Sequence, residues 1–422
     1  MGSRSSSISG LHKLSIPDRV KFVAAFSNLS DEDVSLLSNF GSLPEDIADR
    51  MIENVISTID VPLGIATNFK INGKDYLIPM AVEEASVIAA CSNAAKIARA
   101  SGGFTARASN PIMIGQIQIV NLGSLDDAKE KILKHEHKIL DLANTRSRTL
   151  REAGAGAQQI ELLEYHDPED MLVIHLIVDV MDAMGANIVN SMCESVAPFI
   201  EEITGGHVNL RILSNLSDRR MAYASAIFRK DLIGGEQVVK NILTSFSLSM
   251  IDPYRAATHN KGIMNGIDAV LLATMNDWRA IEAGAHAFAS LTGYKSLTRY
   301  EITPDGDLSV NIAIPIATGT VGGSTNTVPK ARVARKILNV ENSREFACVL
   351  ASVGLAQNFA AVRALSSEGI QKGHMGLHAR NIAITAGAVG KEIDQVVNIM
   401  KSENTISPSR AKEILALLRK KP

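Results

Sequence analysis

The order of the predicted elements between residues 111 and 215 constrains the fold more than any other feature of the sequence. Apolar and polar residues alternate from Met113 to Val120, which predicts a strand with one buried face. Five more predicted elements follow: a helix over Leu125–Glu152, strands near Gln159–Tyr165 and over Met171–Val180, a helix over Ala186–Ile203, and a strand over Val208–Leu213. The order β-α-β-β-α-β is that of the ferredoxin-like unit. We therefore predict an inserted small domain at residues 111–215.

The flanking sequence predicts a helix-rich large domain built from two separated segments, residues 1–110 and 216–373. A strand-like stretch, Lys74–Met80, leads into an alanine-rich helix that stops near Gly102, and from Ser217 onward we expect mainly helices. The sequence of residues 374–422 predicts short helices, and we expect this tail to form a mobile flap. The expected fold class is α+β, with a discontinuous large domain, an inserted small domain and a C-terminal helical flap.

Composition argues against several classes of function. The 422 residues carry a formal net charge of only −2, so no global field favours nucleic acid or an acidic membrane. The best candidate for a membrane-crossing run, Met171–Val180, has only the length of a strand. The three cysteines are widely spaced in apolar surroundings and form no Cys-x-x-Cys pair, which indicates a reducing compartment and no structural zinc. We expect a soluble, cytoplasmic protein without a metal, a nucleic-acid partner or a membrane partner.

The segment Asp182–Asn187 is a candidate anion site. It follows an apolar strand and opens a helix, so backbone N–H groups and the positive end of the helix dipole would face a phosphate. It has one glycine where the Rossmann fingerprint has three, and an ordinary strand-to-helix turn explains it as often as not. Thr145–Arg148, expected on the long helix of the same domain, could also bind a phosphate through its two arginines. A solvated helix face is the simpler interpretation of that segment.

A second polar cluster, Asp252–Gly262, is predicted to be a loop bounded by proline and glycine. It contains Arg255 and Lys261, and Asn265 follows soon after. A loop rich in cationic side chains is rarely buried in a core, and it can bind an anion.

Candidate catalytic carboxylates are expected at two helix starts. Glu84 lies with Ser86 where the predicted strand gives way to a helix, so both side chains can face outward. Asp277 precedes the helix that begins at Trp278, where an N-cap is its simplest role. A capping aspartate can also be a catalytic one.

His374 and His378 are four residues apart and would share one face of a helix. Zinc hydrolases use this spacing with a glutamate after the first histidine, but here Met375 stands in that place. One catalytic and one structural histidine is therefore the favoured interpretation, and metal binding is the alternative.

Taken together, these segments resemble the 3-hydroxy-3-methylglutaryl-CoA (HMG-CoA) reductase family. The matching segments occur in the family's order over nearly the whole chain: Glu53–Ile56, Glu83–Ser86, Asp182–Asn187, Arg255–Gly266, Asn276–Trp278, Gly319–Gly323 and Gly373–Met375. Each segment alone is unspecific, whereas the joint match is highly specific. The stretch Asp252–Gly262 resembles that of the soluble, class II branch of the family. The expected lack of a membrane anchor agrees with that branch.

The resemblance implies reduction of HMG-CoA to mevalonate and free CoA by two NAD(P)H, through a hemithioacetal and an aldehyde. Lys261 matches the lysine that stabilises the hemithioacetal oxyanion, and His374 matches the histidine that protonates the CoA thiolate. Glu84 matches the glutamate that protonates the aldehyde oxygen, which requires a raised pKa. Asp277 matches the aspartate that couples this lysine to this glutamate.

The resemblance also implies binding residues and an assembly. Arg255 would bind the free carboxylate of the substrate, while Ser86 and Asn265 would orient the HMG group. The cofactor would bind at Asp182, Met184, Gly185, Ala186, Asn187, Arg146, Ser147 and Arg148. A homodimer or a higher homo-oligomer, with the active site at the interface, is implied as well.

The residue at position 147 bears on the choice of cofactor. NADH-using bacterial members of the family carry an acidic residue at the matching position, where it can bind the ribose 2′-hydroxyl. This chain has Ser147 flanked by Arg146 and Arg148, which would attract a 2′-phosphate. We expect NADPH to be preferred, with NADH as the weaker cofactor.

Two other functions are kept as alternatives. One is a metal-dependent CoA-thioester hydrolase that uses His374 and His378. The other is a catalytically silent CoA-binding module. NADPH oxidation that depends on HMG-CoA distinguishes both alternatives from a reductase.

Overall fold

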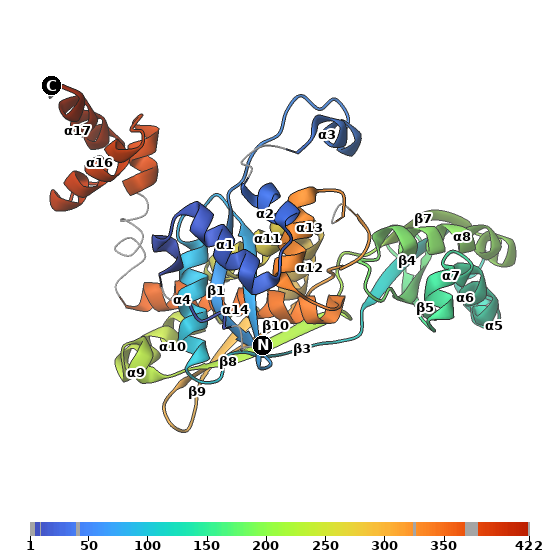
Figure 1. Cartoon of the computed structure of the whole chain (residues 1–422). Helices are drawn as coiled ribbons and strands as arrows, with labels where there is room; N and C mark the ends of the chain where they lie inside the picture. Colours follow the sequence, from blue (N-terminus) through green and yellow to red (C-terminus); the bar gives the residue numbers. More distant parts are fainter. Residues whose placement is uncertain (1–4, 9, 39–42, 324–325, 368–378, 421–422) are drawn as a thin grey trace.

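The computed structural model describes residues 5–8, 10–38, 43–323, 326–367 and 379–420. A central body carries a small unit of strands and helices at one end, and the C-terminal helices lie at the other end (Figure 1). Separate hydrophobic clusters form in the body, in the small unit and in the C-terminal helices. Each of these parts therefore has an apolar core of its own.

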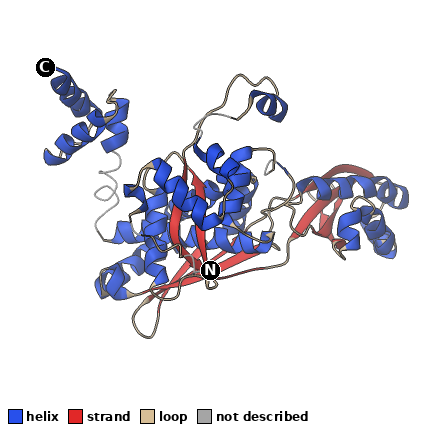
Figure 2. Cartoon of the chain, in the orientation of Figure 1, coloured by secondary structure: helices blue, strands red, loops and turns tan. Residues whose placement is uncertain are grey.

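The small unit contains one antiparallel sheet in the order β5-β6-β4-β7. Its elements, in chain order, are β4 (Ile112–Val120), α5 (Leu125–Lys134), α6 (Glu136–Asn144), α7 (Arg148–Glu152), β5 (Gly156–Tyr165), β6 (Met171–Asp179), α8 (Ala186–Thr204) and β7 (His207–Leu213). Alternate residues of β4, such as Ile117 and Ile119, are fully buried against the helices. Figure 2 shows this sheet and its helices apart from the body.

The long helix expected at 125–152 is wrong, because the segment is three helices. His135 ends α5 and begins α6 with φ −108° and ψ 14°, and its ring contacts the carbonyl of Lys131. Ser147 is extended, and its Oγ accepts from the N–H of Leu150 as the N-cap of α7. Arg146 and Ser147 therefore lie in a break between helices and not on a helix face.

The body contains a hairpin and a second antiparallel sheet. The hairpin pairs β1 (Leu63–Ile71) with β2 (Lys74–Ala81), and the sheet has the order β3-β8-β10-β9, formed by β3 (Thr105–Ala108), β8 (Met221–Phe228), β10 (Leu308–Pro315) and β9 (Thr298–Ile302). The expectation of mainly helices after Ser217 missed three of these strands. The β8 sequence is rich in alanine, which has a low strand propensity, and the strand is stabilised by its place in the interior of the sheet.

Three helices pack together at the centre of the body: α4 (Val87–Arg99), α11 (Pro253–Ala273) and α14 (Ser343–Ser366). Helix α14 is long and apolar enough to cross a membrane, which corrects the expectation that Met171–Val180 is the best candidate. Yet 83% of its apolar window is buried inside the structure. Its aromatic rings pack within the core, as where Phe359 stacks on Phe228. Helix α14 is therefore the central helix of the body.

The remaining helices complete the body and the C-terminal part. They include the 3-10 helix η1 (Leu11–Lys13), α1 (Ile16–Ser27), α2 (Asp31–Ser38), α3 (Glu45–Met51), α9 (Lys230–Ile233), α10 (Glu236–Ile251), α12 (Trp278–Ser290), α13 (Pro329–Leu338), α16 (Lys391–Ser402) and α17 (Pro408–Lys420). Helix α17 begins where Ser407 and Pro408 predict a start. Helix α3 lies on an arm that extends away from the body (Figure 1).

Candidate functional site

A cavity of about 850 Å³ lies beside helices α4, α11 and α14, and Ile382 and Ile406 of the C-terminal part also line it. Among its lining residues are five that the sequence singled out: Glu84, Ser86, Arg255, Lys261 and Asn265. These residues come from segments far apart in the chain. The fold therefore brings most of the expected substrate site into one place.

Glu84 and Lys261 face each other in this cavity, with Nζ of the lysine 3.6 Å from Oε2 of the glutamate. The two side chains are 44% and 62% exposed, respectively. An exposed pair of this kind contributes little to stability. The pairing of an acid with a fixed cation is instead useful for chemistry on a polar carbonyl group.

The segment Asp252–Gly262 is helical, so the prediction of a loop is wrong. Asp252 accepts from the N–H of Arg255 as the N-cap, and Pro253 occupies the first turn of α11. Arg255, Lys261 and Asn265 of this helix all line the cavity. A rigid helix therefore carries the cationic side chains, and partial burial lowers the pKa of Arg255.

A buried polar network lies behind Arg255. Nε2 of His259 is 2.6 Å from Oγ1 of Thr298, and the Thr298 hydroxyl donates to Oδ1 of Asn358 at 3.2 Å. The Tyr300 hydroxyl donates to the same Oδ1 at 2.7 Å. Burial, assisted by the charge of Arg255, lowers the pKa of His259 to about 3. The histidine is therefore neutral and serves as a fixed support for the cavity wall.

Sequence reasoning missed the two buried amides of α14 that line the cavity, Gln357 and Asn358. They stand in a helix whose other residues are mainly apolar, and their exposures are 5% and 1%. Buried amides in an apolar helix are the one signal that could have indicated a site.

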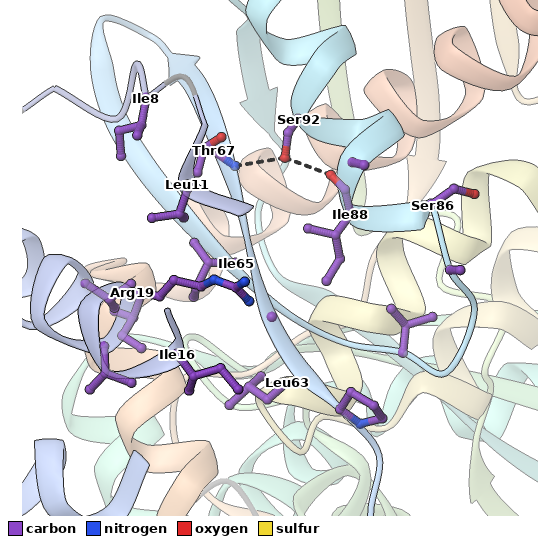
Figure 3. Close-up of a pocket in the computed structure, with 18 of the residues that line it drawn as sticks. Ile8, Leu11, Ile16, Arg19, Leu63, Ile65, Thr67, Ser86, Ile88 and Ser92 are labelled. Carbon is purple, nitrogen blue, oxygen red and sulfur yellow. Dashed lines mark hydrogen bonds between the residues drawn. The ribbon is translucent and has the colours of Figure 1, made fainter. Parts of the chain in front are cut away.

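Ser86 begins α4 with φ 82°, in the left-handed region that a serine rarely adopts. This conformation turns the chain sharply between Glu84 and the helix. Figure 3 shows Ser86 at the edge of a second cavity, of about 910 Å³, which shares Glu84 and Ser86 with the first.

The walls of the second cavity are mainly apolar and come from β1, α4 and the N-terminal segment. Thr67 and Ser92 bring a polar spot to one side, where Oγ of Ser92 accepts from the N–H of Thr67 at 3.1 Å (Figure 3). Lys96 and Lys330 also line it. No part of the sequence analysis predicted this cavity.

Asp277 is the N-cap of α12, as expected, because its Oδ1 accepts from the N–H of Ala280 at 3.1 Å. It also lies 3.3 Å from Arg279. Asp277 is not among the described residues that line the first cavity. His374 and His378 lie outside the described residues.

The segment Asp182–Asn187 joins β6 to α8, and Gly185 begins the helix with φ 106° and without a side-chain cap in the described structure. The first N–H groups of this 19-residue helix are thus available to an anion. The side chain of Asp182 instead accepts from the N–H of Ser343 at 2.8 Å.

The predicted phosphate-binding Arg148 pairs with Glu152 at 2.6 Å in an exposed contact. Within the described ranges, no group of three or more His, Cys, Asp or Glu side chains is arranged to hold a metal.

Comparison with known proteins identifies the relatives of this chain. The model of the family described as hydroxymethylglutaryl-coenzyme A reductase matches residues 15–379. The chain belongs to this family. The resemblance inferred from the sequence motifs is thereby confirmed.

Within the family, the chain is 56% identical to a 3-hydroxy-3-methylglutaryl-coenzyme A reductase of Archaeoglobus fulgidus, over 98% of this chain and 95% of the relative. It is also similar to the solved reductase of Streptococcus pneumoniae, with a TM-score of 0.83, 37% identity, and coverage of 97% of this chain and 100% of the other. A structure of the class II reductase from the same organism, bound to NADPH in open conformations, has a TM-score of 0.81 and 37% identity, over 96% of this chain and 100% of the other. The reductase family thus accounts for the mixed α/β fold over almost the whole chain.

Proposed function

We propose that this protein reduces HMG-CoA to mevalonate and CoA with two NADPH. The observation that carries the proposal is the Glu84–Lys261 pair, with its 3.6 Å separation, inside a cavity that Arg255 also lines. This arrangement supplies an acid, a fixed cation and a carboxylate-binding group in one place. The family and the similarity to an NADPH-bound class II reductase support it.

The chain's residues have distinct tasks in this reaction. NADPH, when bound, supplies the two hydrides. Lys261 stabilises the oxygen that becomes negative when the thioester is reduced. His374 gives a proton to the departing CoA thiolate, and Glu84 gives one to the aldehyde oxygen in the second reduction. The family resemblance gives Asp277 the task of coupling Lys261 to Glu84; in this structure its side chain caps α12 and pairs with Arg279.

Arg255 binds the free carboxylate of the HMG group, with Ser86 and Asn265 orienting its polar groups. Guanidinium binds carboxylate with two parallel hydrogen bonds, and α11 holds this residue rigidly. The CoA arm extends from the same place into the second cavity, which begins at the shared Glu84 and Ser86. Its apolar walls suit the arm, and Lys96 and Lys330 suit its phosphates.

The NADPH site is in the small unit, and the residues there fit an anionic dinucleotide. The glycine-capped start of α8 can receive the pyrophosphate, at the segment that includes Asp182, Met184, Ala186 and Asn187. Arg146 and Ser147 stand in the break before α7, and Arg148 is the first residue of that helix, so all three can reach the 2′-phosphate. The exposed Arg148–Glu152 pair costs little to open.

The proposed division into three domains rests on the sheet order of the small unit and on the residues that line the first cavity. Residues 111–215 form a ferredoxin-like cofactor domain, supported by the strand order β5-β6-β4-β7. Residues 1–110 and 216–373 form the substrate domain, and residues 374–422 form a flap, supported by the presence of Ile382 and Ile406 in the wall of the first cavity. The enzyme is a cytoplasmic homodimer or higher homo-oligomer that completes its active site at an interface.

Steady-state kinetics test this function directly. NADPH absorbance should fall only when HMG-CoA is present, with two NADPH oxidised for each mevalonate formed. Release of CoA that needs no NADPH and stops on addition of a chelator would instead show the metal hydrolase. Binding of CoA without either reaction would show a silent module.

A further inference from the structure

Arg220 is a buried cation whose side-chain hydrogen bonds in the described structure go to backbone carbonyls, while the charges of Asp179 and Asp182 act on it from beyond ion-pair distance. It directly precedes β8 and is 5% exposed. Its guanidinium donates to the carbonyls of Ala183 and Met184, at 3.1 and 3.0 Å, and to the carbonyl of Thr318. No carboxylate among the described residues lies within ion-pair distance. A buried charge is costly unless hydrogen bonds and opposite charges offset its lost hydration, so these three carbonyl contacts are what keep the guanidinium in place.

The three carbonyls belong to two different segments. Ala183 and Met184 are in the turn that opens α8, where the cofactor is proposed to bind. Thr318 follows β10 of the body. One planar side chain thus joins the small unit to the body, with several donors in a fixed geometry.

Other contacts hold the same turn from the body side. The carbonyl of Asp182 accepts from the N–H of Thr320 at 2.8 Å, and the Oγ of Ser343 donates to the carbonyl of Met181 at 3.0 Å. Gly319 packs so closely that a Cβ atom there would lie 2.6 Å from the backbone nitrogen of Met184. The turn and the segment after β10 therefore behave as one packed block.

The block continues to the segment that carries Asp277. Oδ1 of Asn276 accepts from the Oγ1 of Thr318 and from the N–H of Gly319, both at 3.0 Å. Asn276 is 8% exposed and directly precedes Asp277. A series of buried and part-buried hydrogen bonds thus links the turn that opens α8, through Arg220 and Thr318, to Asn276, the chain neighbour of Asp277.

We propose that Arg220 is a positioning residue that holds the cofactor turn in register with the Asp277 segment. The inference rests on the proposed function, because it assigns a support to that function's cofactor site. Arg220 touches neither substrate nor cofactor; it fixes where the N–H groups of α8 lie and so governs NADPH affinity and hydride alignment. Burial lowers the pKa of Arg220 to about 10, so the side chain stays protonated at neutral pH.

The test compares Arg220→Met and Arg220→Lys with the wild-type enzyme. Methionine keeps much of the volume and loses every donor, whereas lysine keeps the charge but cannot bond all three carbonyls with a planar fork. We expect the Kd and KM for NADPH to rise about tenfold or more in Arg220→Met, and less in Arg220→Lys. The KM for HMG-CoA should stay within about twofold, because the Glu84–Lys261 cavity does not include this residue.

Arg299→Met is the matched control, because Arg299 is exposed on β9 and pairs only with Glu301 among the described residues. It should leave both KM values unchanged. NADPH binding is measured by fluorescence, independently of turnover, and Arg220→Lys provides the answer if the methionine variant does not fold.

The outcomes separate the two proposals. Wild-type protein that neither binds nor oxidises NADPH overturns the proposed function. Wild-type activity together with unchanged NADPH affinity in the Arg220 variants overturns the positioning role. An equal rise of the KM values for NADPH and HMG-CoA also overturns it, since general loss of structure would then explain the effect.

Discussion

At the scale of single residues, exposure indicates which charges serve chemistry and which serve folding. Glu84 and Lys261 are paired but 44% and 62% exposed, so removing either should scarcely affect stability. Arg220 is the opposite case, since it is buried and donates three hydrogen bonds to backbone carbonyls. The two classes of cation should therefore respond differently to substitution.

We predict that Glu84→Gln lowers kcat by about a hundredfold or more, because amide nitrogen cannot supply the proton that the aldehyde oxygen needs. The free energy of unfolding should change by no more than about 0.5 kcal/mol. Steady-state kinetics and urea unfolding measure both quantities. Glu83→Gln is the control, because this adjacent carboxylate lines neither cavity, and a similar loss of kcat there would contradict the assignment.

His259 provides a prediction about pH. Its pKa is lowered to about 3 in the folded state by burial and by Arg255, whereas the ordinary value is about 6.5. Between these values the unfolded chain binds a proton that the folded chain does not, so stability falls as pH falls. One such proton contributes a slope of about 1.4 kcal/mol per pH unit.

The variant His259→Gln should remove that slope, so its stability should decline less steeply from pH 6.5 to pH 5 than that of the wild type. Urea unfolding across this range measures the difference. The exposed His137 serves as the control, since His137→Gln should keep the wild-type slope. Parallel curves for the wild type and His259→Gln would show that the buried histidine does not carry the acid sensitivity.

At the scale of elements, short-range sequence patterns predicted some helices and strands correctly and others wrongly. The strand alternation of β4 and the turn before α8 follow from short-range patterns, and they are present. The segment Asp252–Gly262 was expected to be a loop because its residues are polar, although Asp252 and Pro253 are a helix start. Strand β8 was missed because its alanines favour a strand only when neighbouring strands bury them.

The candidate site was predictable in part for the same reason. Arg255, Lys261 and Asn265 stand close together in sequence, so their cluster was visible before the fold was known. Gln357 and Asn358 reach the same cavity from a helix about a hundred residues later, and Arg220 reaches the turn before α8 through backbone carbonyls. Contacts to backbone atoms leave no trace in side-chain patterns.

The N-cap of helix α7 allows the cofactor preference to be tested without disturbing the fold. Ser147 is its N-cap, and aspartate is an equally good cap. Ser147→Asp should therefore fold normally while repelling a 2′-phosphate. We expect the ratio of kcat/KM values to move toward NADH by about tenfold, as measured with each cofactor at fixed HMG-CoA.

Ser147→Ala separates the cap from the charge. It should cost about 1 kcal/mol through loss of the cap and should leave the preference for NADPH in place. A cofactor ratio in Ser147→Asp that matches the wild type would remove Ser147 from the proposed cofactor site.

At the scale of the whole molecule, the arm around α3 exposes apolar residues that an isolated chain would not be expected to leave in water. Ile56 and Ile59 are 98% and 95% exposed, and Ile52 is 60% exposed. The arm extends away from the body (Figure 1). Clustered apolar exposure of this kind is typical of a surface that another chain covers.

We predict that Ile56→Asp weakens the proposed homodimer, because a carboxylate placed in an apolar interface must lose its hydration without gaining a partner. Light scattering should show a shift toward monomer at micromolar protein, and specific activity should fall together with the dimer fraction if the active site is completed by the second chain. Ile302→Asp, at a half-exposed position of β9, should leave the mass and activity unchanged. A stable dimer in Ile56→Asp would place the interface elsewhere, and full activity in a monomer would show that one chain holds the complete site.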